Sequence, residues 1–290
     1  MNFKEVLLIV NPIAGDTDKK RIISKVKTHL EKEELNFHLY MTSGENDIQQ
    51  IQDKIENEKI ERILVAGGDG TINMVAEATK EYDLSLGILP AGSANGFAVN
   101  FDIPENLDDQ IKVAIGNKFI EVDMLCLNGM VCLHMGDLGI NAELIRNYEK
   151  SSIRGKFGYL IQSIPTLIQS EFPFYFSIET ENEKRDTSGV LLGFANLNKY
   201  GTGANVNPKG KPNDGIFEIL IFKKLSLGEI LKTLKNETDL DPDFVEVIQA
   251  KKAKINCKKP VSFQIDGEYI GKENEIDIKV LPQKLKLAIP

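Results

Sequence analysis

Residues 67–71, which read Gly-Gly-Asp-Gly-Thr, form the part of the sequence best suited to chemistry. Glycines let a backbone turn tightly and approach a ligand without clashes from Cβ atoms. A helix is expected to follow, and its unpaired N–H groups and positive dipole end favour a phosphate. Asp69 would repel a phosphate, so it is better suited to hold Mg²⁺ beside a γ-phosphate, directly or through water. The same five residues also suit a plain β-α turn with an Asx-type cap, so this motif alone does not decide the function.

Alternating strand and helix patterns surround this turn in the first part of the chain. Apolar runs ended by Gly, Pro or Asn predict strands, and apolar residues at helical spacing predict helices, one of them capped by Thr71. Short strands separated by such helices predict a parallel sheet covered on both faces, whose ligands bind beyond the carboxyl ends of the strands. The expected strands cover 5–10, 37–41, 63–65 and 84–88, and the expected helices cover 18–30, 46–55 and 71–79.

The pattern changes after about residue 120. Asn128-Gly129 is a strong hairpin signal, and the runs that follow it are mostly strand-like. Two helical patterns interrupt them, at 158–169 and 227–234. The sequence therefore predicts an α/β, Rossmann-like nucleotide domain over 1–120 and an antiparallel β-sandwich domain over 121–290, with the active site in the cleft between them. The last strand, 285–289, fits either domain. The later strands are expected at 119–127, 130–135, 174–178, 190–195, 216–222, 261–265 and 276–280.

Composition excludes several classes of protein. The 290 residues include 43 acidic and 35 basic side chains, giving a formal charge of −8, whereas nucleic-acid-binding surfaces are normally basic. No apolar run approaches the roughly 18 residues of a transmembrane helix. Three cysteines without a CxxC pair and three separated histidines argue against a disulfide framework or a zinc site. We therefore expect a cytoplasmic protein with no nucleic acid partner and no transmembrane segment.

Three further motifs accompany the glycine-rich turn. Residues 11–15 read Asn-Pro-Ile-Ala-Gly, 90–95 read Pro-Ala-Gly-Ser-Ala-Asn, and 266–268 read Asp-Gly-Glu. In this order, the four motifs resemble the diacylglycerol kinase catalytic-domain family, which includes sphingosine kinases and bacterial lipid kinases. The resemblance covers nearly the whole chain and implies that 121–290 is the lipid-substrate domain. The P-loop and dinucleotide-binding patterns and the protein kinase signatures do not occur.

The resemblance implies a role for each matching residue. Glu268 corresponds to the family's proposed general base, which accepts the proton of a lipid hydroxyl. The resemblance thus assigns Glu268 and Asp69 as the catalytic residues. Taken alone, 266–268 would be an ordinary hairpin turn. The residues that the resemblance assigns to ATP are Asn11, Thr42, Gly67, Gly68, Asp69, Gly70, Thr71, Ile72, Asn73 and Ser93.

Residues 211–216, Lys-Pro-Asn-Asp-Gly-Ile, resemble a family loop that holds a structural Mg²⁺. The implied ligands are the main-chain carbonyls of Lys211 and Ile216 and the carboxylate of Asp214, and hard cations prefer such oxygens. A simple turn suits these residues nearly as well. The chain also departs from many bacterial members, which have acidic residues at the positions of Gly96 and Asn213.

These features predict an ATP- and Mg²⁺-dependent kinase that phosphorylates a lipid hydroxyl at a membrane surface. Diacylglycerol is the first choice of substrate, and a sphingoid base or another lipid alcohol follows. An NAD kinase-like enzyme and a non-catalytic lipid- or nucleotide-binding protein are the alternatives, and a homodimer is left open. Lysines could contact the inner membrane face peripherally, although they would equally protect an edge strand. These lysines are Lys251, Lys252, Lys254, Lys258 and Lys259.

Overall fold

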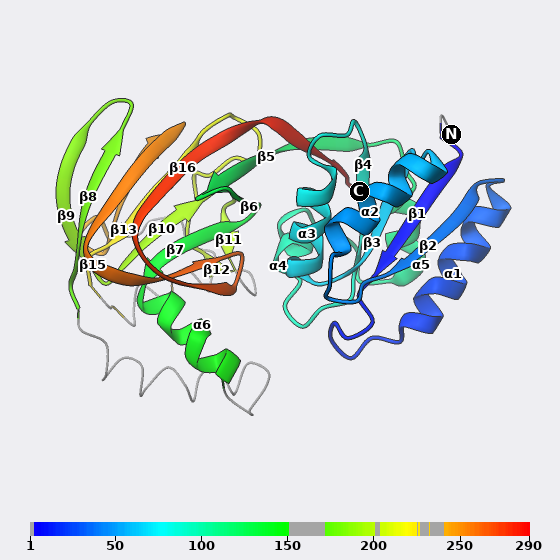
Figure 1. The fold of residues 1–290 in the computed structure, drawn as a ribbon, viewed down its shortest axis with the longest axis horizontal. Coiled ribbons are helices and arrows are strands. Elements are labelled where there is room, and N and C mark those ends of the chain that lie inside the picture. The colour runs from blue at the N-terminus through cyan, green and yellow to red at the C-terminus, as the bar shows by residue number, and fades with distance from the viewer. Residues whose placement is uncertain (1–2, 151–171, 201–203, 225, 227–231, 233–240) are drawn as a thin grey trace. The chain divides into compact units, whose positions relative to one another are not determined.

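The computed structural model describes residues 3–150, 172–200, 204–224, 226, 232 and 241–290. The chain divides into two compact units, Met1–Val122 with Gln283–Pro290, and Asp123–Pro282. Two strands run from one unit into the other: β5 (Phe119–Leu127) and β16 (Glu268–Ala288) (Figure 1).

The first unit contains a parallel sheet in the order β4-β3-β1-β2. Strands β1, β3 and β4 are apolar runs that end at Asn, Gly and Pro, as expected, and β3 is buried along its whole length. The end of β16 also pairs parallel with β4, through Lys286 opposite Ser85, so the last strand returns to this sheet. The four strands are β1 (Glu5–Val10), β2 (Asn36–Met41), β3 (Arg62–Gly67) and β4 (Ser85–Pro90).

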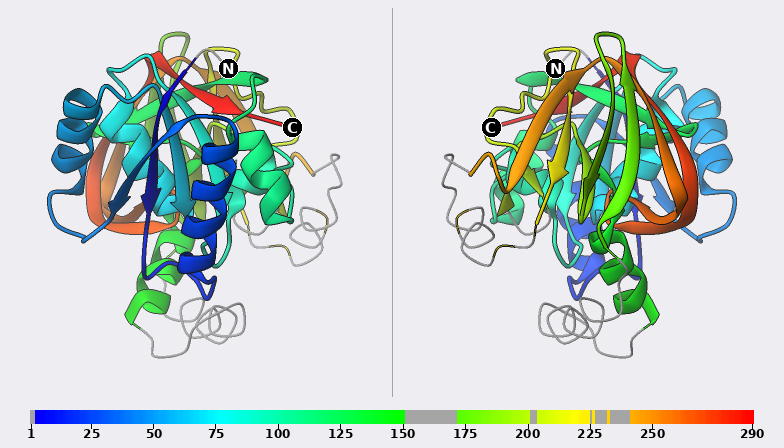
Figure 2. Two further views of the ribbon diagram at one scale, coloured as in Figure 1. Left: turned by 90° about the vertical axis from the view of Figure 1, so that its right-hand side faces the viewer. Right: turned by 90° about the vertical axis from the view of Figure 1, so that its left-hand side faces the viewer.

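Helices cover both faces of this sheet (Figures 1 and 2). Helices α1 and α5 pack their apolar sides onto one core cluster, whereas α2 and α3 contact each other. Asp18 caps α1 by accepting a hydrogen bond from the N–H of Arg21. The helices are α1 (Lys19–Lys32), α2 (Asp47–Glu58), α3 (Asp69–Thr79), α4 (Gly96–Asn100) and α5 (Leu107–Ala114).

The prediction that Thr71 caps α3 is wrong. Gly68 is the N-cap, and its carbonyl accepts the N–H groups of both Thr71 and Ile72, so the helix already begins at Asp69. Thr71 therefore lies inside the first turn, where its hydroxyl meets Asn11 instead.

The second unit is built mainly of antiparallel strands (Figure 2), which enclose a large apolar core cluster and a smaller one. Asn128 and Gly129 both have positive φ, 49° and 89°, and join β5 to β6 in the predicted hairpin. The sequence missed the helix α6 (Ile140–Lys150) and the strands β9, β11, β12 and β14, as well as the helices α4 and α5 of the first unit. The predicted helices at 158–169 and 227–234 lie outside the described residues, apart from isolated positions. The strands are β6 (Met130–Cys132), β7 (Met135–Gly139), β8 (Phe174–Thr180), β9 (Lys184–Gly189), β10 (Leu191–Ala195), β11 (Lys199–Tyr200), β12 (Ala204–Asn205), β13 (Phe217–Phe222), β14 (Val245–Ala250) and β15 (Lys252–Ile265).

Across the residues that the structure describes, no helix combines the length and the apolar character needed to cross a membrane.

Candidate active site

Three turns meet at the carboxyl ends of β1, β3 and β4 (Figure 1). A Cβ atom on Gly92 would lie 2.4 Å from the Cα of Gly68, and one on Gly15 would lie 2.7 Å from the carbonyl oxygen of Ala91. Gly15 also has a φ of +50°, which favours glycine. The three motifs thus touch backbone to backbone, which side chains at these positions would prevent.

Hydrogen bonds fix this contact. Asn11 donates from Nδ2 to the hydroxyl of Thr71 over 3.1 Å, and the Ala91 N–H donates to the Gly67 carbonyl over 2.9 Å. Gly67 is required here because a Cβ atom would lie 2.5 Å from the Thr71 side chain. The N–H groups of Asp69 and Gly70 belong to the first turn of α3, where a helix has no acceptors of its own. Such a helix start is suited to phosphate oxygens.

Asp69 has a structural role that the sequence did not reveal. Its two carboxylate oxygens accept the backbone N–H groups of Gly96 and Phe97, each over 2.9 Å. Asp69 therefore joins the turn after β3 to the start of α4. A carboxylate has about four lone-pair sites, so these two bonds leave capacity for a cation.

The other residues assigned to ATP lie on the third turn, at the end of β2 and on α3. Ser93 is exposed in the third turn, and the Thr42 N–H binds the Val10 carbonyl at the end of β1. Asn73 is half-buried one turn into α3. Ile72 is only 1% exposed and its N–H is used within the helix, so it can offer a nucleotide no side-chain surface.

Lys19 is a residue at this site that the sequence analysis missed. Its ammonium donates to the carbonyls of Ala14, Thr17 and Ala91, and so links the first turn to the third. Desolvation lowers the pKa of Lys19. Its position, eight residues after Asn11 at the start of α1, was the available signal. This cation places positive charge beside the glycine turns.

In the second unit, Asp266 and Gly267 form a two-residue hairpin between β15 and β16, with φ values of 49° and 90°. The Asp266 carboxylate accepts the backbone N–H groups of residues 133, 134 and 135 over 2.8, 2.8 and 3.0 Å. Glu268 follows at the start of β16 and is exposed. The turn is therefore anchored from a distant strand, which an ordinary solvated hairpin would not need.

The loop at 211–216 offers oxygen ligands. Asp214 is exposed, and its Oδ1 accepts the Ile216 N–H over 3.3 Å. Asp123, which is fully buried in β5 and was missed in the sequence, accepts the Gly215 N–H over 2.6 Å and brings a second carboxylate to the loop. Among the described residues, no three His, Cys, Asp or Glu side chains are grouped to hold a metal. Main-chain oxygens with one or two carboxylates nevertheless fit Mg²⁺.

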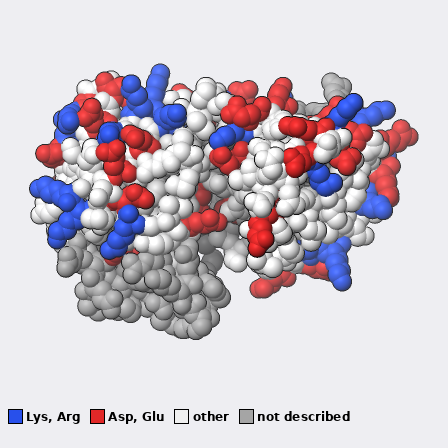
Figure 3. All heavy atoms as spheres, in the orientation of Figure 1, with Lys and Arg blue, Asp and Glu red and all other residues white. Residues whose placement is uncertain are grey.

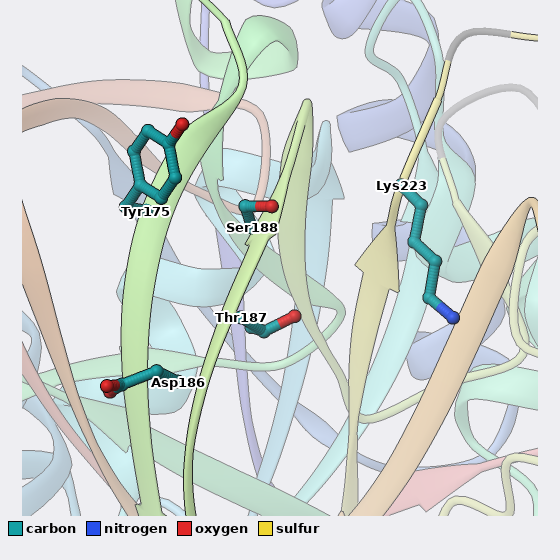
Figure 4. A pocket seen from close by; sticks show the side chains of 5 residues that line it. All are labelled: Tyr175, Asp186, Thr187, Ser188 and Lys223. Carbon is teal, nitrogen blue, oxygen red and sulfur yellow. The ribbon is translucent and has the colours of Figure 1, made fainter.

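A surface pocket in the second unit does not include any of the candidate site residues. A shallow pocket on β8 and β9 is lined by Tyr175, Asp186, Thr187, Ser188 and Lys223, none of which was a candidate (Figure 4). Basic and acidic side chains are intermixed on the visible face of the molecule (Figure 3).

We expect Asp69→Asn to lower the free energy of unfolding by about 1–3 kcal/mol, because an amide oxygen can replace only one of the two acceptors and turns an NH₂ group toward the other N–H. Chemical denaturation would measure this loss. Asp53→Asn is the control, since Asp53 is exposed on α2 and accepts a side-chain hydrogen bond from Gln49. Equal stability of the Asp69→Asn variant and the wild type would contradict the structural role of Asp69.

Comparison with known proteins identifies the class. The diacylglycerol kinase catalytic domain matches residues 5–127, and the YegS C-terminal NAD kinase beta sandwich-like domain matches residues 137–289. The chain therefore belongs to the lipid kinases of the diacylglycerol kinase catalytic-domain family.

Individual relatives agree with this assignment. Proteins named probable lipid kinase YegS from Salmonella typhimurium and Salmonella paratyphi A are 29% identical over 296 residues, covering 100% of this chain and 97% of theirs. A putative diacylglycerol kinase from Bacillus anthracis has the same fold, with a TM-score of 0.81, 22% identity and coverage of 100% and 98%. An NAD kinase from Archaeoglobus fulgidus, solved in complex with ATP, is similar in fold at a TM-score of 0.58, 13% identity and coverage of 98% and 93%.

Proposed function

We propose that this lipid kinase transfers the γ-phosphate of ATP to a lipid hydroxyl with the help of Mg²⁺, and that diacylglycerol is its first-choice acceptor. The observation that carries the proposal is the backbone contact of three glycine turns at the start of α3. In a member of a lipid kinase family, such a cradle is best explained as the site for the donor's phosphates. The ATP complex of the structurally similar NAD kinase supports the choice of donor.

The residues of the first unit would bind the donor. N–H groups of the α3 start would bind phosphate oxygens, with Lys19 adding a positive charge beside them. Asn11 and Thr71 would keep the cradle closed through their mutual hydrogen bond. Bound Mg²⁺ would neutralise the charge that develops on the transferred group, and the remaining lone pairs of Asp69 are suited to it.

Glu268 would act on the acceptor. Its exposed carboxylate would accept the proton of the lipid hydroxyl as that oxygen forms its bond to the γ-phosphorus and the bond to the ADP oxygen breaks. The anchored 266–267 hairpin would hold this carboxylate in place.

Peripheral binding to the cytoplasmic face of a membrane is part of the proposal, because the acceptor is a lipid. The candidate lysines are only partly available: Lys254 pairs with Glu275 over 2.8 Å, and Lys258 lies 4.7 Å from the ring centroid of Tyr175. We therefore expect a weak electrostatic contribution from this segment.

The experiment is a product assay. The purified protein would be incubated with ATP, Mg²⁺, a lipid extract in detergent micelles and NAD, and mass spectrometry would detect products that gain one phosphate. Phosphorylated diacylglycerol supports the proposal in full, and another phosphorylated lipid corrects the acceptor. Phosphorylated NAD alone would favour the NAD kinase alternative, and a bound but unmodified lipid would favour a binding protein.

We expect Mg²⁺ to raise the unfolding temperature through the 211–216 loop, because a ligand that binds only the folded state stabilises it. Asp214→Ala should abolish this shift with little loss of stability in the absence of Mg²⁺, since Asp214 is exposed and the hydrogen bond that it accepts from the Ile216 N–H is long, at 3.3 Å. Asp243→Ala, at another exposed aspartate, is the control. Thermal unfolding with and without MgCl₂ decides the question, and an unchanged shift in Asp214→Ala would exclude Asp214 as a ligand.

A further inference from the structure

A fully buried carboxylate lies close to the hairpin that carries Glu268. Asp137 on β7 has no exposed surface, and its Oδ1 accepts the N–H of Ala142 over 3.1 Å. Its Oδ2 accepts the side-chain amides of Asn141 and Gln264, each over 2.5 Å. Burial raises the pKa of Asp137 to about 7, although these hydrogen bonds oppose the shift. Burying a carboxylate costs folding free energy, so Asp137 is a candidate for a functional role.

Gln264 connects this cluster to the hairpin through hydrogen bonds. It is also fully buried, and its Oε1 accepts the N–H of Gly267 over 2.8 Å. Because Asp137 accepts the NH₂ end of the Gln264 amide, the oxygen end must face Gly267. Asp137, together with the Met135 carbonyl that accepts the same NH₂ group over 3.4 Å, thus fixes which way this amide points.

The hairpin is consequently held on both of its turn residues. The backbone N–H groups of Leu133, His134 and Met135 donate to the carboxylate of Asp266. The side-chain oxygen of Gln264 accepts the N–H of Gly267. Glu268 is the next residue, so these hydrogen bonds also fix the position of its backbone.

We propose that Asp137 and Gln264 are positioning residues for Glu268, with Asp137 orienting the Gln264 amide that holds the Gly267 N–H. This inference rests on the proposed function, in which Glu268 is the base. A misplacement of about 1 Å at a reacting group can reduce a rate about 10²-fold, so a rigid hairpin has a kinetic consequence.

The direction of these hydrogen bonds, from donor to acceptor, predicts the effect of each substitution. In Asp137→Asn, the single amide oxygen can face either the Ala142 N–H or the NH₂ groups of Gln264 and Asn141. When it faces Ala142, the new NH₂ group meets that of Gln264, so the Gln264 amide would turn and present a donor to the Gly267 N–H. In Gln264→Glu, two carboxylates would face each other and repel. In the double variant, the amide introduced at position 137 would donate to one oxygen of the carboxylate introduced at position 264. The other oxygen of that carboxylate would again accept the Gly267 N–H.

The experiment is a double-mutant cycle on the full chain, with kcat, both KM values and thermal unfolding measured for each variant. We expect each single substitution to lower kcat about 10-fold or more with little change in the KM for ATP, and the double variant to recover most of the loss. Glu218→Gln is the matched control, because Glu218 is 2% exposed and also accepts two side-chain amides, from Asn207 and Gln249. It should lose stability but keep its kcat.

Two further measurements separate the possible failures. In a Glu268→Gln background, Asp137→Asn should cause no additional loss of kcat, because the pair acts through Glu268. Amide hydrogen exchange at Gly267 does not depend on activity and should accelerate in Asp137→Asn and slow again in the double variant. If exchange and kcat are unchanged in Asp137→Asn, the inference is wrong. If Gly267 exchange follows the cycle but Glu268→Gln retains full kcat, the assignment of the base fails and the positioning role for catalysis fails with it.

Discussion

Glu268→Gln should lower kcat by about 10²–10⁴-fold, the usual contribution of a general base, while leaving the fold intact. The amide has nearly the shape of the carboxylate but cannot accept the proton of the lipid hydroxyl. Glu268 is exposed on a hairpin that is anchored through Asp266 and Gly267, so its replacement leaves the anchoring hydrogen bonds in place. Steady-state kinetics with the lipid identified by mass spectrometry, together with thermal unfolding, would measure both effects.

Glu273→Gln is the control for this experiment, because it makes the same chemical change on the same strand, β16, outside the candidate site. It should leave kcat near the wild-type value. A Glu268→Gln enzyme that keeps kcat within about twofold would show that another group accepts the proton, since losing a base costs much more than this. Loss of ATP binding in the same variant would instead place Glu268 at the donor site.

Local patterns were enough to predict the strands of the first unit. Apolar runs such as Ile63–Val65 are long enough for a buried strand and end at Gly or Pro, so no tertiary information was needed. The Asn128-Gly129 turn was predicted for the same reason, because its two positive φ values suit these residues. The strand β14 was missed although Val245 and Val247 alternate with polar residues, and its signal is short.

The positions of the glycine motifs were visible in the sequence, but the roles of their polar side chains were not. Asp69 was assigned to magnesium, but the backbone N–H groups of Gly96 and Phe97 that also donate to it come from nearly thirty residues later and could not be foreseen. Thr71 has the residue type of a helix cap, yet Gly68 occupies that position and Asn11 takes the hydroxyl. Each of these roles depends on a partner from another turn, and such partners have no local signature.

The buried groups of the second unit were hidden from the sequence for a related reason. Asp137 and Gln264 are separated by more than a hundred residues and meet only because β7 and β15 pair in register. Asp123 likewise meets Gly215 through the fold. A polar residue within a strand normally indicates an exposed face, so its burial can be predicted only once its hydrogen-bond partner is known.

Gly92→Ala should disable the donor site, because its Cβ atom would lie 2.4 Å from the Cα of Gly68 and force two of the three turns apart. Backbone on both sides of this contact leaves no flexible side chain to move. We expect kcat/KM for ATP to fall about 10²-fold, as for a displacement of about 1 Å at a reacting centre.

A matched control for Gly92→Ala lies on β4, the strand that leads into the third turn. In Gly87→Ala, the Cβ atom would lie 2.4 Å from the Cβ of Ala114 in the core, so the overpacking is similar but distant from the turns. Both variants should unfold at lower temperature, whereas only Gly92→Ala should lose affinity for ATP, measured by calorimetry below the unfolding transition. If Gly92→Ala binds ATP as tightly as Gly87→Ala does, the donor phosphates do not lie on the three glycine turns.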